Sequence, residues 1–308
     1  MNKSICLVGV FKKGSTNVPM AKSFTRYGFF VIPVNYRTII TTYGMGFFNQ
    51  FMHHVMIKYK PCLTLFSKCN GVDPEIVSMC NKYSKTWLFF MDAKPILAAN
   101  PEIIQHIKNS DISSCTASDM VEWFRSQGVK NCHHIVQGID PDIFKPVEPE
   151  NRYKADISFL GTRTPERDKF KKALEDAGFN VKFYGHGYNQ ELVDEEFSKV
   201  CSSSKFILSM NTFNNIHKGY FSNRLPRCLA CGVTTFHYDN TGTLNDFFED
   251  GKEVIYVKDE YDLIDKMKKI DDTIAGKIAL AGRERVLKDY TWDNIIGKML
   301  TLAKRITK

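Results

Sequence analysis

The chain alternates between short apolar runs and amphipathic stretches, in two series separated by a proline-rich segment. In the first series, runs such as residues 4–11, 61–67 and 85–92 predict buried strands, and a long helix is expected over about 46–60. Strands that alternate with helices at this spacing form a parallel sheet with right-handed crossovers. The alternation therefore predicts an α/β fold.

Residues 138–151 interrupt the alternation with three prolines and several acidic residues, which is typical of a linker. A second series follows, with helices expected at 165–178 and 242–251, among others. Two Rossmann-like, doubly wound domains are therefore predicted, over residues 1–145 and 146–290. Because ligands bind at the carboxyl ends of the strands in such sheets, the active site is expected in a cleft between the domains.

The composition matches a protein with an ordinary buried core, since 43% of the 308 residues are hydrophobic and 25% are charged. A chain of this length does not need disulfides, so its nine cysteines are expected to be reduced. Cys228 and Cys231 lack a second pair at metal-binding spacing, and no metal site is predicted. The first apolar run is too short for a signal sequence and no window is long enough to span a membrane, so a cytoplasmic location is expected.

The net charge of +8 is modest, but the positive residues are unevenly placed. The first acidic residue is Asp73, and nine cations precede it. These are Lys3, Lys12, Lys13, Lys22, Arg26, Arg37, Lys58, Lys60 and Lys68. A segment of this kind attracts a polyanion or an acidic membrane surface. The alternative is that its charges only keep the protein soluble.

The most specific motifs lie in residues 110–146, 155–174 (ADISFLGTRTPERDKFKKAL), 205–211 (KFILSMN) and 223–267. Together they resemble the two-domain glycosyltransferases of the GT-B architecture, in particular the spore-coat CgeB-like branch and, more distantly, the phage DNA glucosyltransferases. The resemblance implies sugar transfer from a nucleotide-sugar donor on the C-terminal domain to an acceptor facing the N-terminal domain. A UDP-sugar is the expected donor and no further cofactor is implied. The final helix, residues 291–308, is expected to pack back on the N-terminal domain.

The stretch LGTRTPER carries groups suited to a nucleotide diphosphate. Gly161 allows close approach of the backbone, and Thr162 offers a hydroxyl. Arg163 and Arg167 offer forked cations for phosphate oxygens. For Arg167, an ordinary surface position on a helix is the alternative.

Further along the chain, His186 and Asn211 follow or end strands and are expected to lie beside the same ligand. A helix start at Ser222, Asn223 and Arg224 offers backbone and side-chain donors suited to pyrophosphate. An exposed loop position for His186, and ordinary helix capping by Ser222 or Asn223, are the alternatives.

Two glutamates, eight positions apart, are implied by the family's retaining members where this chain has Gly219 and Arg227. The second glutamate accepts hydrogen bonds from ribose hydroxyls, whereas an arginine has only donors. Arg227 is therefore expected to hold the donor differently, by pairing with a phosphate or a carboxylate. A shifted helix and loss of donor binding are the alternatives.

Asp92 closes the fourth predicted strand, so its carboxylate is expected at the carboxyl edge of the first sheet. An inverting transfer needs a general base for the acceptor hydroxyl, and the phage enzymes that the chain resembles have an aspartate at the equivalent strand end. A turn-forming role is the alternative for Asp92, and His53 or His54 is the alternative base. Gly14 and Ser15 form the first strand-to-helix turn, where neighbouring lysines are expected to steady phosphate charge.

DNA is the acceptor that the cationic N-terminal segment favours, because its cations are interleaved with Phe, Tyr and His. The specific expectation is glycosylation of a hydroxymethylated base in viral DNA, flipped out or otherwise exposed. A glycolipid or cell-envelope polysaccharide is the rival acceptor. A nucleic-acid-binding protein without catalysis, on the same fold, is the rival from another class.

Overall fold

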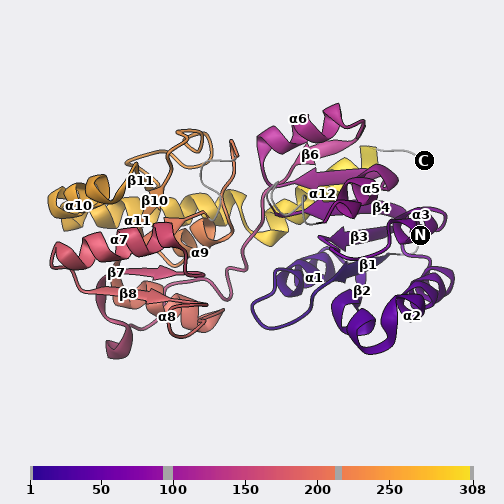
Figure 1. Cartoon of the computed structure of the whole chain (residues 1–308), viewed down its shortest axis with the longest axis horizontal. Coiled ribbons are helices and arrows are strands. Elements are labelled where there is room, and N and C mark those ends of the chain that lie inside the picture. Colours follow the sequence, from indigo (N-terminus) through magenta and orange to yellow (C-terminus); the bar gives the residue numbers. More distant parts are fainter. Residues whose placement is uncertain (1–2, 93–99, 212–216, 306–308) are drawn as a thin grey trace. The chain divides into compact units, whose positions relative to one another are not determined.

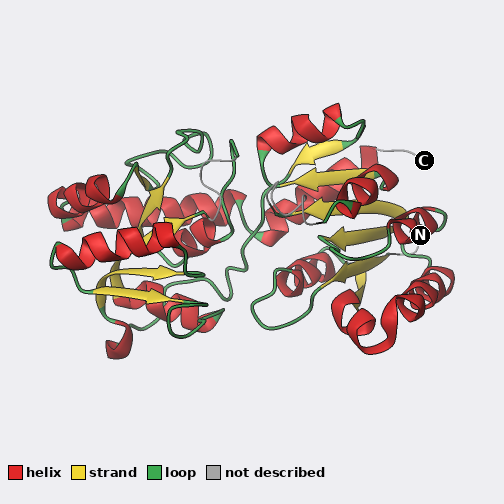
Figure 2. Cartoon of the chain, in the orientation of Figure 1, coloured by secondary structure: helices red, strands yellow, loops and turns green. Residues whose placement is uncertain are grey.

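The structure is a computed structural model that describes residues 3–92, 100–211 and 217–305. It consists of two compact units: unit 1 comprises Met1–Gln137 and Trp292–Lys308, and unit 2 comprises Gly138–Thr291. In each unit helices flank a parallel sheet, as Figures 1 and 2 show. The predicted α/β class with two Rossmann-like domains is therefore confirmed.

Unit 1 contains a six-stranded parallel sheet in the order β2-β1-β3-β4-β5-β6. Its strands are β1 (Ser4–Gly9), β2 (Phe30–Asn35), β3 (Leu63–Ser67), β4 (Lys85–Phe90), β5 (Ile112–Cys115) and β6 (Cys132–His134). Its described helices are α1 (Asn17–Arg26), α2 (Tyr36–Tyr59), α3 (Pro74–Asn81), α5 (Glu102–Asn109), α6 (Ser118–Ser126) and α12 (Trp292–Arg305).

Unit 2 contains a five-stranded parallel sheet in the order β11-β10-β9-β7-β8. Its strands are β7 (Ala155–Leu160), β8 (Val181–Tyr184), β9 (Ser204–Met210), β10 (Thr234–Tyr238) and β11 (Ile255–Val257). Its described helices are the 3₁₀ turn η1 (Asn151–Tyr153), α7 (Pro165–Asp176), α8 (Glu195–Ser203), α9 (Arg224–Ala230), α10 (Glu260–Lys269) and α11 (Asp272–Asp289).

Both sheets reverse their strand order after the first two strands. The reversal lies between β1 and β3 in unit 1 and between β7 and β9 in unit 2. The loops after the strands diverge there, which opens a crevice at the carboxyl ends where open α/β sheets bind ligands. Each unit therefore has a defined place for a ligand.

Buried apolar side chains hold each sheet against its helices. Leu7, Leu65 and Phe89 in unit 1 are fully buried, as are Phe159 and Phe236 in unit 2. Burying a side chain of this size stabilises the fold by about 1.5–3 kcal/mol relative to exposure. The packed sheets keep the strand ends, and the side chains on them, in fixed positions.

Helix α12 packs against α1 within unit 1. Asp293 in its first turn accepts hydrogen bonds from the Ser23 hydroxyl at 2.6 Å and from Arg26 Nε at 2.8 Å. A partly exposed ion pair contributes only about 0.2–1 kcal/mol. The buried apolar side chains of Trp292 and Ile296 therefore supply most of the attachment.

The segment 138–145, which the sequence assigns to the N-terminal domain, packs on unit 2. The Ile139 amide donates to the Tyr290 carbonyl at 2.9 Å, and the Ser198 hydroxyl donates to the Ile143 carbonyl at 2.8 Å. The chain passes from unit 1 to unit 2 before this segment.

Helix α2 begins at Tyr36, well before the start predicted near residue 46. Its first turns contain β-branched Ile39 and Ile40, which are weak helix formers, so the sequence did not favour a helix there. Gly44 has φ 83° and ψ 167°, and it divides α2 into two helical segments.

Residues 242–251, predicted as a helix, form turns instead. The Asn245 side chain accepts from the Asp250 amide at 2.9 Å, and the Asp250 carboxylate accepts from the Tyr256 amide at 2.9 Å. Such local bonds compete with helical hydrogen bonds. The prediction also missed α11, which Asp271 caps by accepting from the backbone amides of its first turn. Residues 212–216, part of the loop before α9, lie outside the described residues.

Candidate functional site

A cavity of about 190 Å³ lies at the carboxyl ends of β7 and β8 in unit 2. It brings together six residues predicted to bind the donor, namely Gly161, Thr162, His186, Asn223, Arg224 and Arg227. Its other lining residues are Leu160, Tyr184, Gly185, Glu191, Leu192, Val193 and Phe197. Residues from β7, β8, α8 and α9 therefore converge on one concave site.

Two arginines join the carboxyl ends of β7 and β9, where the strand order reverses. Arg167 is buried, and it donates to the Thr162 carbonyl at 2.5 Å and to the Met210 carbonyl at 3.2 Å. Arg224 donates to the Leu160 carbonyl and to the same Met210 carbonyl. The two guanidinium groups therefore lie side by side at the reversal point, held by backbone oxygens.

The pKa values of three arginines in this region are lowered. Burial lowers the pKa of Arg167 to about 9, and the positive charge of Arg224 adds to the effect. Burial also lowers the pKa of Arg224, and it lowers that of Arg227 to about 10. A bound anion favours the charged form of each group. The cluster is therefore chemically suited to an anion with several oxygens, such as a diphosphate.

Two glycines allow the ends of β7 and β8 to approach each other closely. The Gly161 amide donates to the Tyr184 carbonyl at 2.8 Å. Gly185 has φ 130°, and a Cβ atom there would collide with the Gly161 carbonyl. A Cβ atom on Gly161 would lie 2.5 Å from Nη2 of Arg224. A larger residue at either position would therefore displace the backbone or the arginine.

Asn211 fixes the chain that leads into α9. Its Nδ2 donates to the Tyr220 carbonyl at 3.0 Å, and its Oδ1 accepts from the Ser222 amide at 2.8 Å. Asn223 precedes α9 without a side-chain capping bond, and the buried Ser222 Oγ has no partner in the described part of the chain. The capping role considered for these two side chains is absent, which leaves their polar atoms available to a ligand.

Arg227 lies on α9, with its guanidinium carbon 4.7 Å from the centroid of the Phe144 ring. Its Nε is buried and finds no partner among the described residues. This position presents hydrogen-bond donors, where a glutamate would present acceptors.

The carboxyl edge of the unit 1 sheet carries amide and hydroxyl side chains at successive strand ends. Buried oxygens without a partner in the described residues belong to Ser15, Asn17, Asn35, Ser67, Asn70 and Thr116. Buried polar atoms are normally hydrogen-bonded, so such a group of them at a reversal of strand order indicates a ligand or water. Gly14, with φ 77°, and Ser15 form the turn after β1, as predicted from their sequence position.

Asp92 lies at the same edge, directly after β4, and accepts a hydrogen bond from Lys68 Nζ at 2.6 Å. Lys68 and Cys69 follow β3 and have φ values of 65° and 62°. A left-handed backbone costs an ordinary residue about 1–2 kcal/mol. Two such residues in succession therefore indicate a functional constraint, and they turn the lysine toward Asp92.

The comparisons with known proteins agree with this geometry. Residues 163–301, somewhat under half of the chain, match the family model described as glycosyl transferase-like. The chain has the two-domain GT-B fold. No curated protein sequence matches.

Solved structures of similar fold cover nearly the whole chain. Sucrose-phosphate synthase from Thermosynechococcus elongatus has a TM-score of 0.66 at 14% identity, over 98% of both chains. A DNA-modifying β-glucosyltransferase, solved with and without uridine diphosphoglucose, has a TM-score of 0.67 at 14% identity, over 98% of this chain and 100% of the other. A trehalose-6-phosphate synthase has a TM-score of 0.67 at 9% identity, over 98% and 99%. At these identities the likeness concerns the fold.

Arg163 does not line the cavity that contains the six predicted donor-site residues, and neither do Arg167, Asn211 and Ser222. The Arg163 side chain is more than half exposed and pairs with Asp168 at 2.8 Å. It lines a separate hollow of about 480 Å³ together with Tyr188. His53 and His54 lie near the end of α2, which leads to the amino end of β3, whereas Asp92 lies at the carboxyl edge.

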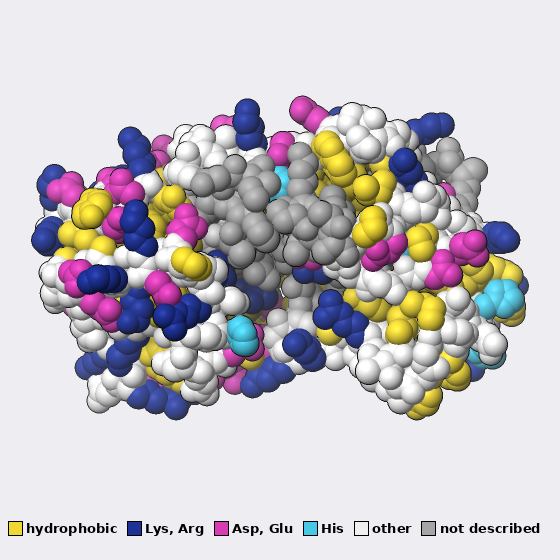
Figure 3. All heavy atoms as spheres, viewed as in Figure 1, with side chains coloured by type: hydrophobic (Ala, Val, Ile, Leu, Met, Phe, Trp, Pro, Cys, Tyr) yellow, Lys and Arg dark blue, Asp and Glu magenta, His cyan; other side chains and the backbone are white. Residues whose placement is uncertain are grey.

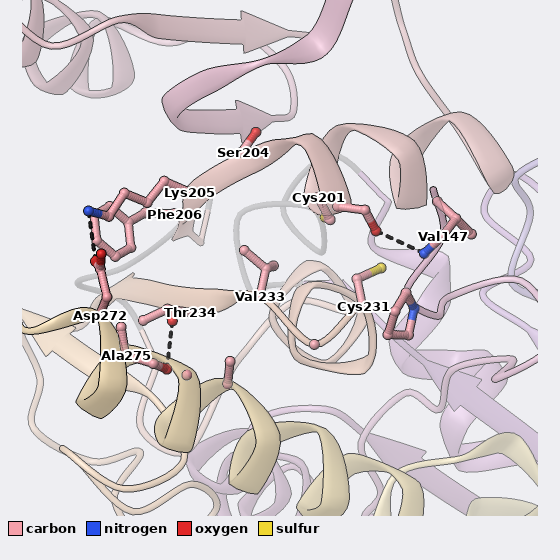
Figure 4. A pocket seen from close by; sticks show the side chains of 15 residues that line it. Val147, Cys201, Ser204, Lys205, Phe206, Cys231, Val233, Thr234, Asp272 and Ala275 are labelled. Carbon is pink, nitrogen blue, oxygen red and sulfur yellow. Dashed lines mark hydrogen bonds and ion pairs between the residues drawn. The ribbon is translucent and has the colours of Figure 1, made fainter. Parts of the chain in front are cut away.

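A larger cavity, of about 520 Å³, lies at the opposite edge of the unit 2 sheet, where β9 and β10 begin. Figure 4 shows that its polar side chains already have partners: Lys205 pairs with Asp272 at 2.8 Å, and the Thr234 hydroxyl donates to the Ala275 carbonyl at 2.8 Å. The amino edge of an α/β sheet is not its ligand edge. The smaller, cationic cavity is therefore the candidate site.

Sequence reasoning missed Lys68, Phe144 and Leu192, whose places depend on tertiary packing. Only the apolar character of Leu192 and Phe144 was visible in the sequence. Among the described residues, no group of three His, Cys, Asp or Glu side chains is placed to hold a metal ion, and no helix has the length and apolarity to cross a membrane.

Proposed function

We propose that this GT-B protein transfers a sugar from a nucleotide-sugar donor, with a UDP-sugar as the expected donor, to a hydroxyl group of DNA. Unit 2 binds the donor and unit 1 binds the acceptor. The observation that carries the proposal is the arginine cluster at the strand-order reversal of unit 2, where Arg167 and Arg224 bridge β7 and β9.

The donor's pyrophosphate fits this cluster by charge and by geometry. Arg224 presents a guanidinium in the cavity, with Gly161 leaving room for close approach of phosphate oxygens. Ser222 adds a hydroxyl that has no partner in the described residues. Negative charge develops on the leaving diphosphate during transfer, and fixed cations at that point stabilise it.

The remainder of the cavity suits the nucleoside. Leu192 and Phe197 supply apolar surface, and His186 lies at the rim. Arg227 takes the place of an acceptor for ribose hydroxyls and offers its Nε and the neighbouring nitrogens as donors. The nucleotide sugar is therefore bound through hydrogen-bond donors of the protein, which pair with an anionic group of the nucleotide or of the sugar.

Asp92 acts as the general base in this proposal. As the acceptor oxygen bonds to the anomeric carbon, its proton passes to the Asp92 carboxylate and the bond from that carbon to the diphosphate oxygen breaks. Lys68, at 2.6 Å from Oδ1, holds the carboxylate in place. The hydroxyls and amides of the unit 1 edge surround the acceptor.

We choose DNA as the acceptor because the first 72 residues contain nine cations and no acid. Among proteins of this fold, a DNA-modifying β-glucosyltransferase covers 98% of the chain. A hydroxymethylated base, as found in modified DNA, supplies the hydroxyl. A glycolipid acceptor and a catalytically inactive binding protein are the outcomes that an experiment must separate from it.

A thermal-shift screen against nucleotide sugars and nucleoside diphosphates tests the proposal. A ligand at a hundredfold its Kd stabilises its unit by about 2.7 kcal/mol. We expect one nucleotide to raise the Tm of the wild type, and Arg227→Glu to change which nucleotide does so. Sugar transfer to hydroxymethylated DNA, and not to lipid, then identifies the acceptor. If no nucleotide raises the Tm, the protein is not a nucleotide-sugar transferase.

A further inference from the structure

The helix α2 exposes an unusual amount of apolar surface for a helix of unit 1. The side chains of Tyr43 and Phe47 are exposed, at 64% and 47%, although both are large and aromatic. In the space-filling view, hydrophobic and histidine side chains gather over the region of α2 (Figure 3; compare Figure 1). Exposed apolar patches of this kind mark interaction sites.

The exposed rings of Tyr43 and Phe47 and the half-buried ring of Phe51 form a continuous series along the helix. The ring centroids of Tyr43 and Phe47 are 4.9 Å apart, and those of Phe47 and Phe51 are 6.4 Å apart with the rings inclined by only 17°. Gly44 breaks the helix between the first two rings, yet they remain in contact. The chain therefore leaves Tyr43 and Phe47 exposed, while other aromatic residues of unit 1, such as Phe48, are buried.

The charges on α2 are positive only. Arg37 in its first turn and Lys58 in its last are exposed, and none of its 24 residues is acidic. The first acidic residue of the chain is Asp73, so the sequence around α2 adds no opposing charge. A partner that fits this face is anionic and offers flat surfaces for stacking.

A DNA strand with unstacked bases has both properties. Bases stack on aromatic side chains while cations follow the phosphates, without a demand for a particular sequence. A helix that lies on a membrane separates an apolar face from a charged one. On α2, the exposed Thr38, Thr41 and Thr42 are interleaved with the apolar residues, so the two kinds of side chain are not separated in that way.

We propose that the surface of α2 formed by the exposed Tyr43 and Phe47 and the half-buried Phe51, with the exposed Arg37 and Lys58, binds unstacked bases of the acceptor DNA. The proposal rests on the proposed function, because it deepens the choice of DNA as acceptor. Helix α2 starts directly after β2, at the same edge of the unit 1 sheet as Asp92. Of the residues in the proposed surface, Arg37 in the first turn therefore lies nearest to the edge that carries the proposed base.

Fluorescence anisotropy with a labelled single-stranded oligonucleotide of about 20 nucleotides, longer than one binding site, tests this surface. We expect Tyr43→Ala with Phe47→Ala to raise the Kd at least about fivefold, because stacking of one base is worth roughly 1–3 kcal/mol. The matched control is Tyr261→Ala on α10 of unit 2, a tyrosine that is 72% exposed, and it is expected to leave the Kd unchanged.

The salt dependence separates stacking from phosphate contact. Lys58→Gln is expected to lower the slope of log K against log salt by about 0.7, the value for one phosphate contact to a single strand. Lys268→Gln on α10 is the control and is expected to leave the slope as it is. The Tyr43 and Phe47 variant is expected to weaken binding without changing the slope.

The results that overturn the proposal are distinct from those that overturn the function. If the wild type binds the oligonucleotide and the double variant binds equally well, α2 is not the surface, and the transferase proposal stands. If phosphatidylserine vesicles bind and the oligonucleotide does not, the face is a membrane surface. If neither binds and light scattering shows a dimer that the double variant dissociates, the face is covered by a second copy. Nucleotide-induced Tm shifts, retained by the double variant, report on unit 2 separately.

Discussion

At the strand-order reversal of unit 2 the carboxyl edge holds Arg167 and Arg224, whereas the corresponding edge of unit 1 holds amide and hydroxyl side chains beside Lys68 and Asp92. The two sheets share one topology of strand reversal, so the fold does not account for the difference. The side chains that follow each strand do. One edge is suited to a multiply charged anion, and the other to neutral hydroxyls and a proton transfer.

Asp92→Asn is expected to have the largest effect on activity. It is expected to change the chemistry at the edge of unit 1 and to leave unit 2 unaffected. Loss of the general base lowers the rate of sugar transfer by about 10²–10⁴-fold. Nucleotide binding to unit 2, measured by thermal shift, is expected to stay as in the wild type. Asp73→Asn is the control, because Asp73 caps α3 in the same unit by accepting from the Glu75 amide at 2.9 Å. Equal rates for the wild type and Asp92→Asn would remove Asp92 from the chemistry.

Arg224→Gln is expected to weaken nucleotide binding, because it removes one of the two positive charges at the strand-order reversal of unit 2. A charged hydrogen bond contributes about 1.5–3 kcal/mol, so the Kd for the nucleotide rises roughly 10–150-fold. Arg283→Gln is the matched control, since Arg283 also donates to a backbone carbonyl of unit 2, that of Ala230, at 3.1 Å. Calorimetry with the nucleotide found in the thermal-shift screen measures both. Equal loss of affinity in the two variants would mean a general effect on the unit.

Acid sensitivity is expected to distinguish the units, because their buried histidines differ. His237 on β10 is fully buried with both ring nitrogens unpartnered in the described residues, and burial lowers its pKa to about 3. Burial also lowers the pKa of His106 in unit 1, but its Nε2 bonds with the Val72 carbonyl at 2.7 Å, which opposes the shift. The fold therefore holds His237 neutral.

The unfolded chain takes up a proton on this histidine below about pH 6.5, whereas the folded chain does so only near pH 3. Stability is therefore lost as the pH falls through that window, by about 2 kcal/mol between pH 7 and pH 5. We expect His237→Leu to remove this loss in urea unfolding at the two pH values. His54→Gln, at an exposed position, is expected to keep it. A loss of the same size in both variants would contradict the assignment.

Lys68→Gly is expected to have the smallest effect. It is expected to raise the stability of the fold and to lower the activity. Glycine adopts the left-handed backbone without the side-chain penalty, so the free energy of unfolding rises by about 1 kcal/mol. The Asp92 carboxylate loses its hydrogen-bond partner, so the rate of transfer falls. Lys60→Gly, at another left-handed lysine with φ 43°, is expected to raise stability equally and to leave the rate of transfer unchanged. A drop in stability at position 68 would show that the lysine is there for packing.

The sequence predicted the fold and the convergence of Gly161 and Arg224, because strand ends of a parallel sheet meet at one edge whatever the distance between them along the chain. It predicted a strand-end position for Asp92 on the same reasoning. It did not predict the Lys68 contact, since a left-handed backbone at two ordinary residues has no sequence signal. Arg163 was predicted to bind the donor because it follows Gly161 and Thr162 in the sequence. Its side chain instead points outward and pairs with Asp168.

Unit 2 is one uninterrupted piece of chain, while unit 1 is built from two. The two ends of unit 2 lie side by side, because Ile139 forms a β-bridge with Thr291 and the Ile139 amide donates to the Tyr290 carbonyl at 2.9 Å. For protein engineering, this makes unit 2 the part of the chain to remove, or to exchange for another domain, because it is joined to unit 1 through two adjacent junctions. The remaining halves of unit 1 then need only a short connection to bring α12 back to α1.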